Sequence, residues 1–468
     1  MKAMLGRTIK GGALVLALGL TSVQARAENL ADALVSAYTH SGLLEQNRAL
    51  LRAADEDVAT AASALLPIIN WSGQVQRTFG ENFGTFGISA SRSTSAEARI
   101  SATYLLYDFG SSAASVEAAK ETVLATRQTL ISIEQQVLLR AIEAYMGVRQ
   151  AYEFVALREN NLRLLTQELR AANDRFDVGE VTRTDVALAQ SRLAQARSGL
   201  ADAQADLQRA HAEYTNVIGR KPGRLAPPPR VPGVQTNLGK AQAEAVRRHP
   251  ALLRVQHRVS AAEFGIKAAE ADMNPTVNLT GNVRLQSNNS STRRVTNGSI
   301  GVEVTGPIYR GGRLSSALRR AMAQRDAARG ELHVARHDVQ QNVANALASL
   351  GAARARLQAT DRQIRAARVA FRGVREEATL GARTTLDVLD AEQELLDAEA
   401  ARISAQVDEY VAAYSVLSTM GLLTAKNLKL NVQHYDPAAY YNLVKDAPAV
   451  NSRQGQKLDK VLRALQKD

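Results

Sequence analysis

The second half of this sequence repeats the first, and this duplication limits the possible folds more than any other feature. The run Gly-x-x-Thr-x-x-Asp-Val begins at Gly179 and again at Gly381, 202 residues further on. A second run, Pro-x-x-Asn-x-x-Gly, begins at Pro67 and again at Pro275, with an offset of 208 residues. Collinear matches indicate a tandem duplication, and the change of offset places a length difference in a surface loop. Both halves should therefore fold alike.

Each half has the same predicted order of elements: short helices, a strand hairpin and two long helices. The first repeat spans 28–218 and the second 237–424; the connector 219–236 contains the Pro/Gly-rich stretch Gly219–Gly233, which cannot be helical throughout. The residues from Asn451 to the end are polar, and we expect them to be disordered. The predicted elements, in order, are short helices over about 29–64, a hairpin over about 67–108, long helices over about 111–176 and 183–218, short helices over about 237–272, a hairpin over about 275–309, long helices over about 313–377 and 385–420, and a tail over 425–468.

The long helices exceed the size of an ordinary globular domain. At 1.5 Å per residue the longest would extend about 90–100 Å, so each must lie along other long helices. Aromatic residues make up only 4% of the chain, which suits closely packed helices better than a sandwich. In the second helix of the first repeat, seam positions alternate three and four apart, with small residues at every other position. They are Val186, Ala189, Leu193, Ala196, Leu200, Ala203, Leu207, Ala210, Tyr214 and Val217.

The first 27 residues have the three parts of a secretory signal peptide. Lys2, Arg7 and Lys10 form a positive region, Gly11–Leu20 is a short apolar region, and Ala25-Arg26-Ala27 predicts cleavage before Glu28. The apolar region is too short to span a membrane, and no later apolar run reaches the length of a transmembrane helix. The chain has no cysteine, so the long helices must be held together by packing without disulfides. We therefore expect an exported protein.

The predicted strands alternate apolar and polar residues over about ten positions. Between Ser95 and Leu106 the even-numbered residues are mostly apolar and the odd-numbered ones mostly polar. Thr276–Gln286 also alternates, with the apolar residues at the odd-numbered positions. This pattern is typical of a transmembrane barrel strand with a wet lumen, and Trp71, Tyr104 and Tyr107 suit the membrane interfaces. A soluble antiparallel sheet with one wet face has the same period. Export and the long helices favour the membrane interpretation.

Four strands cannot close a barrel, because the smallest closed transmembrane barrels use about eight strands. An open sheet edge is not tolerated in lipid. If the strands enter a membrane, several subunits must therefore share one barrel, although this argument does not determine their number. Two alternatives remain at this point: an exported structural or adhesive coiled coil with a soluble hairpin, and a basic nucleic-acid-binding helical protein.

No catalytic motif is present, and we expect neither an enzyme nor a bound cofactor. His333 and His337 lie four residues apart on a predicted helix near Glu331 and Asp338, as a metal-binding pair could. The H-E-x-x-H motif is absent, and the regular charge pattern of this helix favours a solvated face. The formal charge of +12 also reflects Lys and Arg interleaved with Asp and Glu, and no motif for reading a nucleic-acid groove is visible. We therefore expect no nucleic-acid partner.

The two repeated turns carry short sequence motifs that can be compared with those of known protein families. The first has Arg-Phe-Asp-Val-Gly over 175–179 and Thr-Asp-Val over 184–186; the second has Gly-Ala-Arg-Thr over 381–384 and Leu-Asp-Val-Leu-Asp-Ala over 386–391. With the duplicated plan, the mature chain to about residue 424 resembles the TolC family of outer-membrane efflux proteins. The resemblance implies an α+β membrane protein: a homotrimer in which four transmembrane strands per chain form a shared 12-stranded barrel in outer-membrane lipid, continuous with a periplasmic helical barrel.

The same resemblance implies a passive exit duct of a tripartite efflux or type I secretion system. A periplasmic adaptor and an inner-membrane transporter would supply substrate and energy, and the helical tip in the periplasm would open like an iris. Asp387 and Asp390 match carboxylates that ring the narrowest part of the pore, where they would favour cations. A local alternative for Asp387, and for Asp185, is a role in capping a helix.

The resemblance also assigns residues of the turns to a gate latch and to adaptor docking. Arg383 matches an arginine that holds the closed state through contacts to the neighbouring turn, here Thr184 and Asp185. Ala378 stands where the family has a supporting tyrosine, so that part of the latch is absent or rebuilt. Glycine at a sharp turn also has a purely conformational explanation. The residues matching the adaptor-docking tip are Val178, Gly179, Glu180, Leu380, Gly381 and Ala382.

Overall fold

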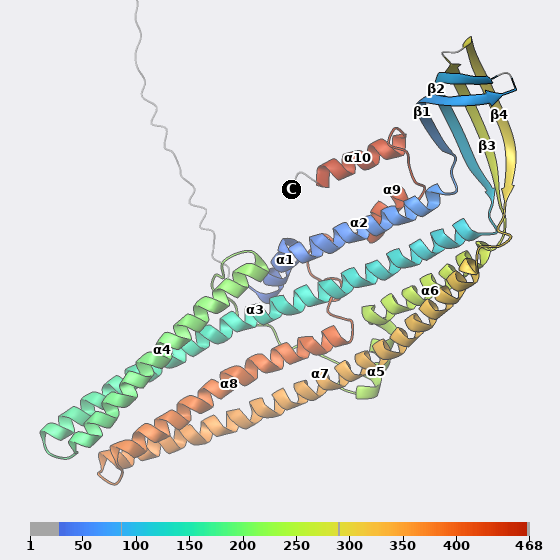
Figure 1. The fold of residues 1–468 in the computed structure, drawn as a ribbon. Coiled ribbons are helices and arrows are strands. Elements are labelled where there is room, and N and C mark those ends of the chain that lie inside the picture. Colours follow the sequence, from blue (N-terminus) through green and yellow to red (C-terminus); the bar gives the residue numbers. More distant parts are fainter. Residues whose placement is uncertain (1–27, 86, 289–290, 466–468) are drawn as a thin grey trace, which may run out of the picture.

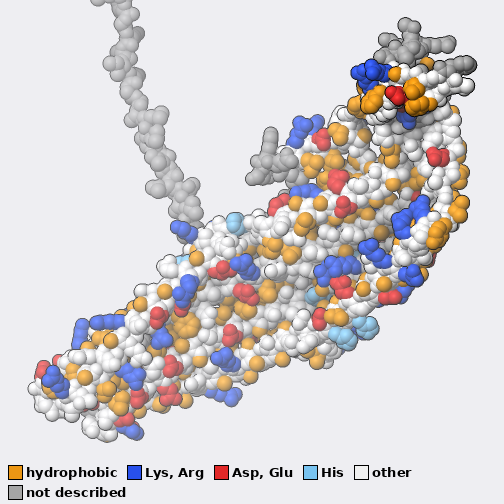
Figure 2. Space-filling view, viewed as in Figure 1, with side chains coloured by type: hydrophobic (Ala, Val, Ile, Leu, Met, Phe, Trp, Pro, Cys, Tyr) orange, Lys and Arg blue, Asp and Glu red, His pale blue; other side chains and the backbone are white. Residues whose placement is uncertain are grey.

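The computed structural model describes residues 28–85, 87–288 and 291–465; the predicted signal peptide, residues 1–27, lies outside them. The described chain is elongated, with a four-stranded sheet at one end and two helix–turn–helix tips at the other (Figure 1). Within the described ranges, no helix combines the length and apolarity needed to cross a membrane. Figure 2 shows acidic and basic side chains mixed along the helical body, as expected for solvated helix faces.

The helices of the two halves correspond one to one. In each half a short helix pair leads into the sheet, and a 67-residue helix leads from the sheet to the tip, where a shorter helix turns back. A helix of this length extends about 100 Å. The first half contains α1 (Leu30–His40), α2 (Gly42–Ser63), α3 (Ser111–Asp177) and α4 (Arg183–Ile218). The second contains α5 (Leu238–Arg248), α6 (Pro250–Ala271), α7 (Arg313–Thr379) and α8 (Thr385–Thr419).

The strands form one antiparallel sheet in the order β1-β2-β3-β4, so the hairpins of the two halves lie side by side. Long helices that extend from one end of an antiparallel sheet make this an α+β fold, as the sequence predicts. The strand bounds are β1 (Ile68–Gly84), β2 (Gly87–Tyr107), β3 (Thr276–Asn288) and β4 (Ser291–Thr305).

The register places the apolar positions of all four strands on one face of the sheet. One row across the sheet runs Ile69, Ala102, Gly281 and Ile300, and the next contains Trp71, Ile100 and Val283. This face is uncovered in the chain, since Trp71 is 83% and Ile300 80% exposed. The opposite face is polar, with a row formed by Asn70, Ser101, Asn282 and Ser299.

The connector crosses the helices and is held by hydrogen bonds near the start of the first repeat. The backbone of Glu28 pairs with residues 224–226, and the Tyr145 hydroxyl of α3 donates to the Ala226 carbonyl oxygen at 2.7 Å. Burial raises the pKa of Tyr145 to about 12, so this hydroxyl remains a donor at neutral pH. The largest buried cluster lies here, where α1, α3, α4, α8 and the tail meet.

The tail is ordered beyond the point that the sequence suggests. It contains α9 (Pro437–Val444), which packs on α2, and α10 (Arg453–Leu465). The expectation that residues from Asn451 onward are disordered is therefore wrong for residues 451–465. Leu458 and Leu462, four residues apart on α10, pack with Tyr440 and Val444 of α9, and this contact stabilises a polar segment as a helix.

Candidate functional site

The candidate site is the pair of turns that end the helical body opposite the sheet, between α3 and α4 and between α7 and α8 (Figure 1). Both turns end the incoming helix with the same two hydrogen bonds. In the first, the Glu180 N–H donates to the Arg175 carbonyl at 2.9 Å and the Gly179 N–H to the Phe176 carbonyl at 3.0 Å. In the second, Ala382 and Gly381 donate to Glu377 and Ala378 at 2.9 and 3.1 Å. This is the Schellman arrangement.

The arrangement explains the glycines and directs two apolar side chains outward. Gly179 has φ 81° and Gly381 has φ 79°, in the left-handed region that favours glycine. The residue before each glycine is a large apolar one that ends the helix: Val178, 71% exposed, and Leu380, 84% exposed. Exposed apolar side chains at the end of the molecule suit a docking contact.

Each outgoing helix begins with a capping box. Thr182 and Thr384 are the N-caps, and Asp185 and Asp387 are the acidic partners three residues on. Asp387 Oδ2 accepts from the Thr384 backbone N–H at 2.9 Å and from its hydroxyl at 2.8 Å. Hydrogen bonds from the threonine hold the pKa of both carboxyls below the usual range, so both are ionised at neutral pH.

The capping role of Asp387 is compatible with a role in a pore. Both of its capping bonds use Oδ2, which leaves Oδ1 available to solvent or a cation. Asp390 lies one turn further along α8 and is 57% exposed at its side chain. Its Oδ1 accepts from Arg192 Nη2 of α4 at 2.7 Å, a partner in the other repeat that the sequence analysis did not predict.

Two of the three predicted latch residues, Asp185 and Arg383, line one cavity of about 520 Å³ between the two turns. Within the described chain the ion-pair partner of Arg383 is Glu377 of its own turn, at 2.9 Å from Nε to Oε2, and Asp185 accepts from Thr182. Thr184 is exposed on the first turn of α4. One chain thus places Asp185 and Arg383 on the same cavity without joining them in an ion pair.

Ala378, which stands where the resembled family has a tyrosine, also lines this cavity. Its side chain is buried and packs with Phe371 and Val388, between α7 and α8. A small residue here leaves open volume between the turns, and Arg383 and Asp185 both border that volume. Position 378 therefore contributes no aromatic side chain to the predicted latch.

Three polar contacts that the sequence does not predict join the two helical hairpins near the tip. Besides Arg192–Asp390, Asn161 of α3 donates to the buried Glu392 of α8, and Arg375 of α7 pairs with Glu168 of α3 at 3.1 Å. The sequence contains one indication of such a contact. Glu392 lies on the buried face of α8 with Val388, Leu389 and Leu396, and a buried carboxylate requires a polar partner.

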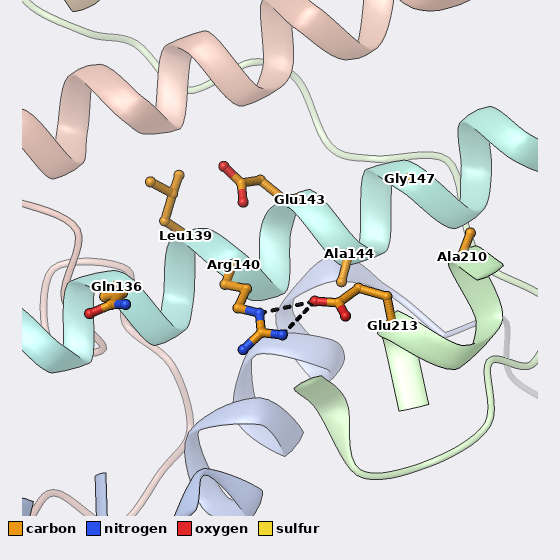
Figure 3. A pocket seen from close by; sticks show the side chains of 8 residues that line it. All are labelled: Gln136, Leu139, Arg140, Glu143, Ala144, Gly147, Ala210 and Glu213. Atoms are coloured by element: carbon orange, nitrogen blue, oxygen red, sulfur yellow. Dashed lines mark hydrogen bonds and ion pairs between the residues drawn. The ribbon is translucent and has the colours of Figure 1, made fainter. Parts of the chain in front are cut away.

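Other candidate sites on the helices have structural explanations. A groove of about 430 Å³ lies between α3 and α4, and Arg140 pairs with Glu213 across it at 2.8 Å (Figure 3). His333 and His337 stack with ring centroids 5.9 Å apart on the exposed side of α7. Within the described ranges, no group of three or more His, Cys, Asp or Glu could hold a metal ion.

Comparisons with known proteins agree with this geometry. The family model described as outer membrane efflux protein matches twice, over residues 33–220 and 242–421, once in each repeat. The chain is 37% identical to the outer membrane efflux protein BepC of Brucella suis over 434 residues, covering 91% of this chain and 92% of that protein. It is 26% identical to the outer membrane protein TolC of Vibrio cholerae, covering 88% and 95%.

Solved structures show the same fold. The Campylobacter jejuni CmeC outer membrane channel superposes with a TM-score of 0.76 at 16% identity, covering 90% of each chain. The family consists of non-enzymatic channels of the cell outer membrane with a periplasmic extension. Because the family model covers most of both repeats, this chain belongs to the TolC-like family of outer membrane efflux proteins.

Proposed function

We propose that three copies of this chain form a closed exit duct across the outer membrane and periplasm. In this proposal an inner-membrane transporter and a periplasmic adaptor deliver substrates, and the duct exports them passively in a tripartite efflux or type I secretion system. The observation that carries the proposal is the incomplete sheet. In the described chain β1 and β4 each pair on one side only, although they are 17 and 15 residues long.

Both the edges and the apolar face require other subunits or lipid. Unpaired backbone groups cost several kcal/mol each in hydrocarbon, so β1 and β4 must find partners in a membrane. In the sheet β1 and β4 run antiparallel to each other, and β4 of one copy can therefore continue onto β1 of the next. Three copies would contribute twelve strands, an even number within the usual range for such barrels.

Cysteine cross-linking tests both the closure and the number of subunits. The chain has no cysteine, so introduced pairs report without background. We would combine Ser299→Cys on β4 with one cysteine on the matching face of β1, at Asn70, Ser72 or Gln74 in turn. A disulfide needs Cα atoms about 4.4–6.8 Å apart, so only neighbouring edges can react. We expect covalent products on denaturing gels that end at three chains.

The matched control places both cysteines on inner strands. Ser101 of β2 and Asn282 of β3 pair directly in the sheet, so Ser101→Cys with Asn282→Cys should cross-link within one chain and produce no ladder. Products ending at another number would replace the trimer with that assembly. An absence of cross-links for all three edge pairs, in a protein extracted with the outer membrane, would contradict closure between β4 and β1.

We further propose that the two turns form the gate at the periplasmic end. Asp387 and Asp390 would ring the constriction, and Arg383 with Thr184 and Asp185 would hold the closed state. Adaptor docking would use Val178, Gly179, Glu180, Leu380, Gly381 and Ala382. The exposed apolar tips, the two ionised capping carboxylates and the shared cavity between the turns support this arrangement. Affinity purification after cross-linking in cells would identify the adaptor and the transporter.

A further inference from the structure

The two repeats meet near the tip in an ion pair between α4 and α8. Arg192 Nη2 lies 2.7 Å from Asp390 Oδ1, and the two residues are 198 positions apart in the chain. The side chains are 31% and 57% exposed, so the pair is in contact with solvent. The pair therefore joins the surface of the first hairpin to a carboxylate of the proposed constriction.

Hydrophobic packing directly beneath the pair sets its geometry. Leu193, next to Arg192, and Leu389, next to Asp390, are both buried in one cluster, together with Leu165 and Ala196. Because the neighbouring residues pack in one cluster, this packing sets the separation of the two backbones that carry the ion pair in this structure. Few other contacts join α4 to α8, so the position of Arg192 depends on this cluster.

Arg192 also lies beside a second carboxylate, the buried Glu392. Arg192, Arg158 and Glu392 line one cavity of about 260 Å³, with Asn161 and Asp202 also at its wall. Burial raises the pKa of Glu392, whereas the Asn161 hydrogen bond and the charges of Arg192 and Arg158 lower it, and Glu168 raises it. The positive charge of Arg192 is thus placed between a buried carboxyl and an exposed one.

We infer that Arg192 determines the ion selectivity of the constriction by neutralising Asp390. This inference rests on the proposed function, in which Asp387 and Asp390 surround the pore. In the closed arrangement each chain then presents the ionised carboxylate of Asp387, whose Oδ1 lies outside the capping bonds, while Asp390 and Arg192 together contribute no net charge. When α8 separates from α4 the ion pair breaks, and the ring of Asp390 carboxylates joins the pore lining.

Removal of the Arg192–Asp390 pair should change the ion selectivity of the pore and have little effect on folding. An exposed ion pair contributes little to stability, so removing it should leave assembly intact. A charge at a narrow aqueous constriction acts on passing ions at short distance, where its effect on selectivity is large. Arg192 is therefore a specificity-determining residue that acts through Asp390.

A double-mutant cycle in planar bilayers tests the inference with the full-length channel. The measurements are the reversal potential in a KCl gradient and the concentration of hexaamminecobalt(III) that blocks half the current. R192Q should free the Asp390 ring, raise cation selectivity and lower the half-blocking concentration by roughly tenfold, which corresponds to about 1.4 kcal/mol. D390N should shift both quantities the other way, because Arg192 is left unpaired.

The double variant R192Q/D390N distinguishes compensation from two independent effects. If the pair is neutral in the closed duct, removing both charges should restore wild-type selectivity and block. R192K should also behave as wild type, because it keeps the charge. The inference is overturned if R192Q changes neither quantity, or if the double variant behaves like D390N alone.

Assembly and the proposed function have separate readouts. Each variant is first checked as a heat-modifiable oligomer, and if R192Q does not assemble, R192D/D390R provides a swapped pair that should again match wild type. If the swapped pair assembles but retains altered selectivity, the inference is wrong. If instead the wild type forms no channel, or if D387N leaves block unchanged, the proposed function fails first.

Discussion

At the scale of single residues, Asp185 and Asp387 have a local and a proposed functional role at the same time. Each completes a capping box with the threonine three positions before it, and such a cap contributes about 1 kcal/mol to the helix. The same hydrogen bonds lower the pKa of both carboxyls, which keeps them charged at the tip. Substitution of either aspartate therefore removes both a cap and a charge, and experiments need a control for the cap.

The latch leads to a prediction about conductance. R383S or D185A should raise the single-channel conductance in planar bilayers, because either change removes the Arg–Asp attraction that we propose between the two turns. The effect on stability should be small, about 1 kcal/mol or less for an exposed pair. The closed state should therefore be weakened while the trimer persists.

Two further variants separate charge from capping. T182A removes the N-cap next to Asp185 but keeps the carboxylate, so it should not raise conductance. E377Q removes the observed partner of Arg383 and makes the guanidinium available to Asp185, so it should not open the channel either. Wild-type conductance in both R383S and D185A would remove the latch from the gate proposal.

Asp55 of α2 supports a prediction about pH. The side chain is 0% exposed, and neither carboxylate oxygen has a hydrogen-bond partner among the described residues. Burial raises its pKa from 3.8 to about 6; Arg127 lowers it and Glu56 raises it further. Between these two pKa values the folded state holds the proton more tightly than the unfolded state, so stability falls as pH rises through this window and then levels off.

D55N should therefore stabilise the helical body at pH 7.5, by up to about 3 kcal/mol, and much less at pH 4. The measurement is thermal unfolding followed by circular dichroism at 222 nm in detergent at both pH values. D57N is the matched control, because Asp57 is exposed on the same helix, and it should show no pH-dependent gain. An equal gain for D55N at pH 4 and 7.5 would show that burial of the charge is not the cause.

At the scale of elements, the two turns are built in the same way from different residues. Each joins a Schellman end to a capping box, which satisfies the free backbone groups at both helix ends and positions one exposed apolar residue at the apex. The geometry requires glycine and a Thr/Asp pair, and those are the residues that the duplication repeats. The apex residue is free to differ, as Val178 and Leu380 do.

The apex residues lead to a prediction about docking. V178S with L380S should weaken co-purification of the adaptor, because the pair loses its exposed apolar contact area, and should leave the oligomer intact. V369S is the control, since Val369 on α7 is 62% exposed but lies three turns from the apex. Unchanged capture of the adaptor by the double variant would move docking away from the tips.

At the scale of the whole molecule, the chain separates two surfaces of opposite character. The sheet carries an uncovered apolar face, whereas the helices carry mixed charge along their length (Figure 2). In the proposed duct the apolar face lies against lipid and the polar face of the sheet lines the lumen. The apolar face would remain exposed to water in a single chain.

This separation predicts different outcomes for two adjacent residues of β4. I300R places a charge on the apolar face, where Ile300 is 80% exposed, and should cost about 2–4 kcal/mol per subunit near the membrane midplane. S299R places the same charge on the opposite face and should assemble normally. The measurement is the yield of heat-modifiable oligomer in outer-membrane fractions. Equal yields for the two variants would contradict the assignment of the lipid-facing side.

The sequence by itself determined the features that follow from local periodicity. Seam residues such as Val186, Ala189 and Leu193 are buried along α4, and the alternating strand residues face opposite sides of the sheet. The observed helix and strand bounds up to α8 fall within a few residues of the predicted ranges, whereas the helices α9 and α10 of the tail were not predicted. These patterns are readable because backbone geometry alone fixes a period of 3.6 or 2 residues.

Only the tertiary structure decided which side chains meet across elements. Arg383 pairs with Glu377 in its own chain, Arg192 with Asp390 of the other repeat, and α10 forms because α9 offers an apolar surface. Each of these residues has many charged or apolar residues as possible partners in the sequence. The local sequence pattern does not indicate which of them it will contact. The choice depends on how the helices pack, since packing at anchors such as Leu193 and Leu389 sets the distances over which charges can pair.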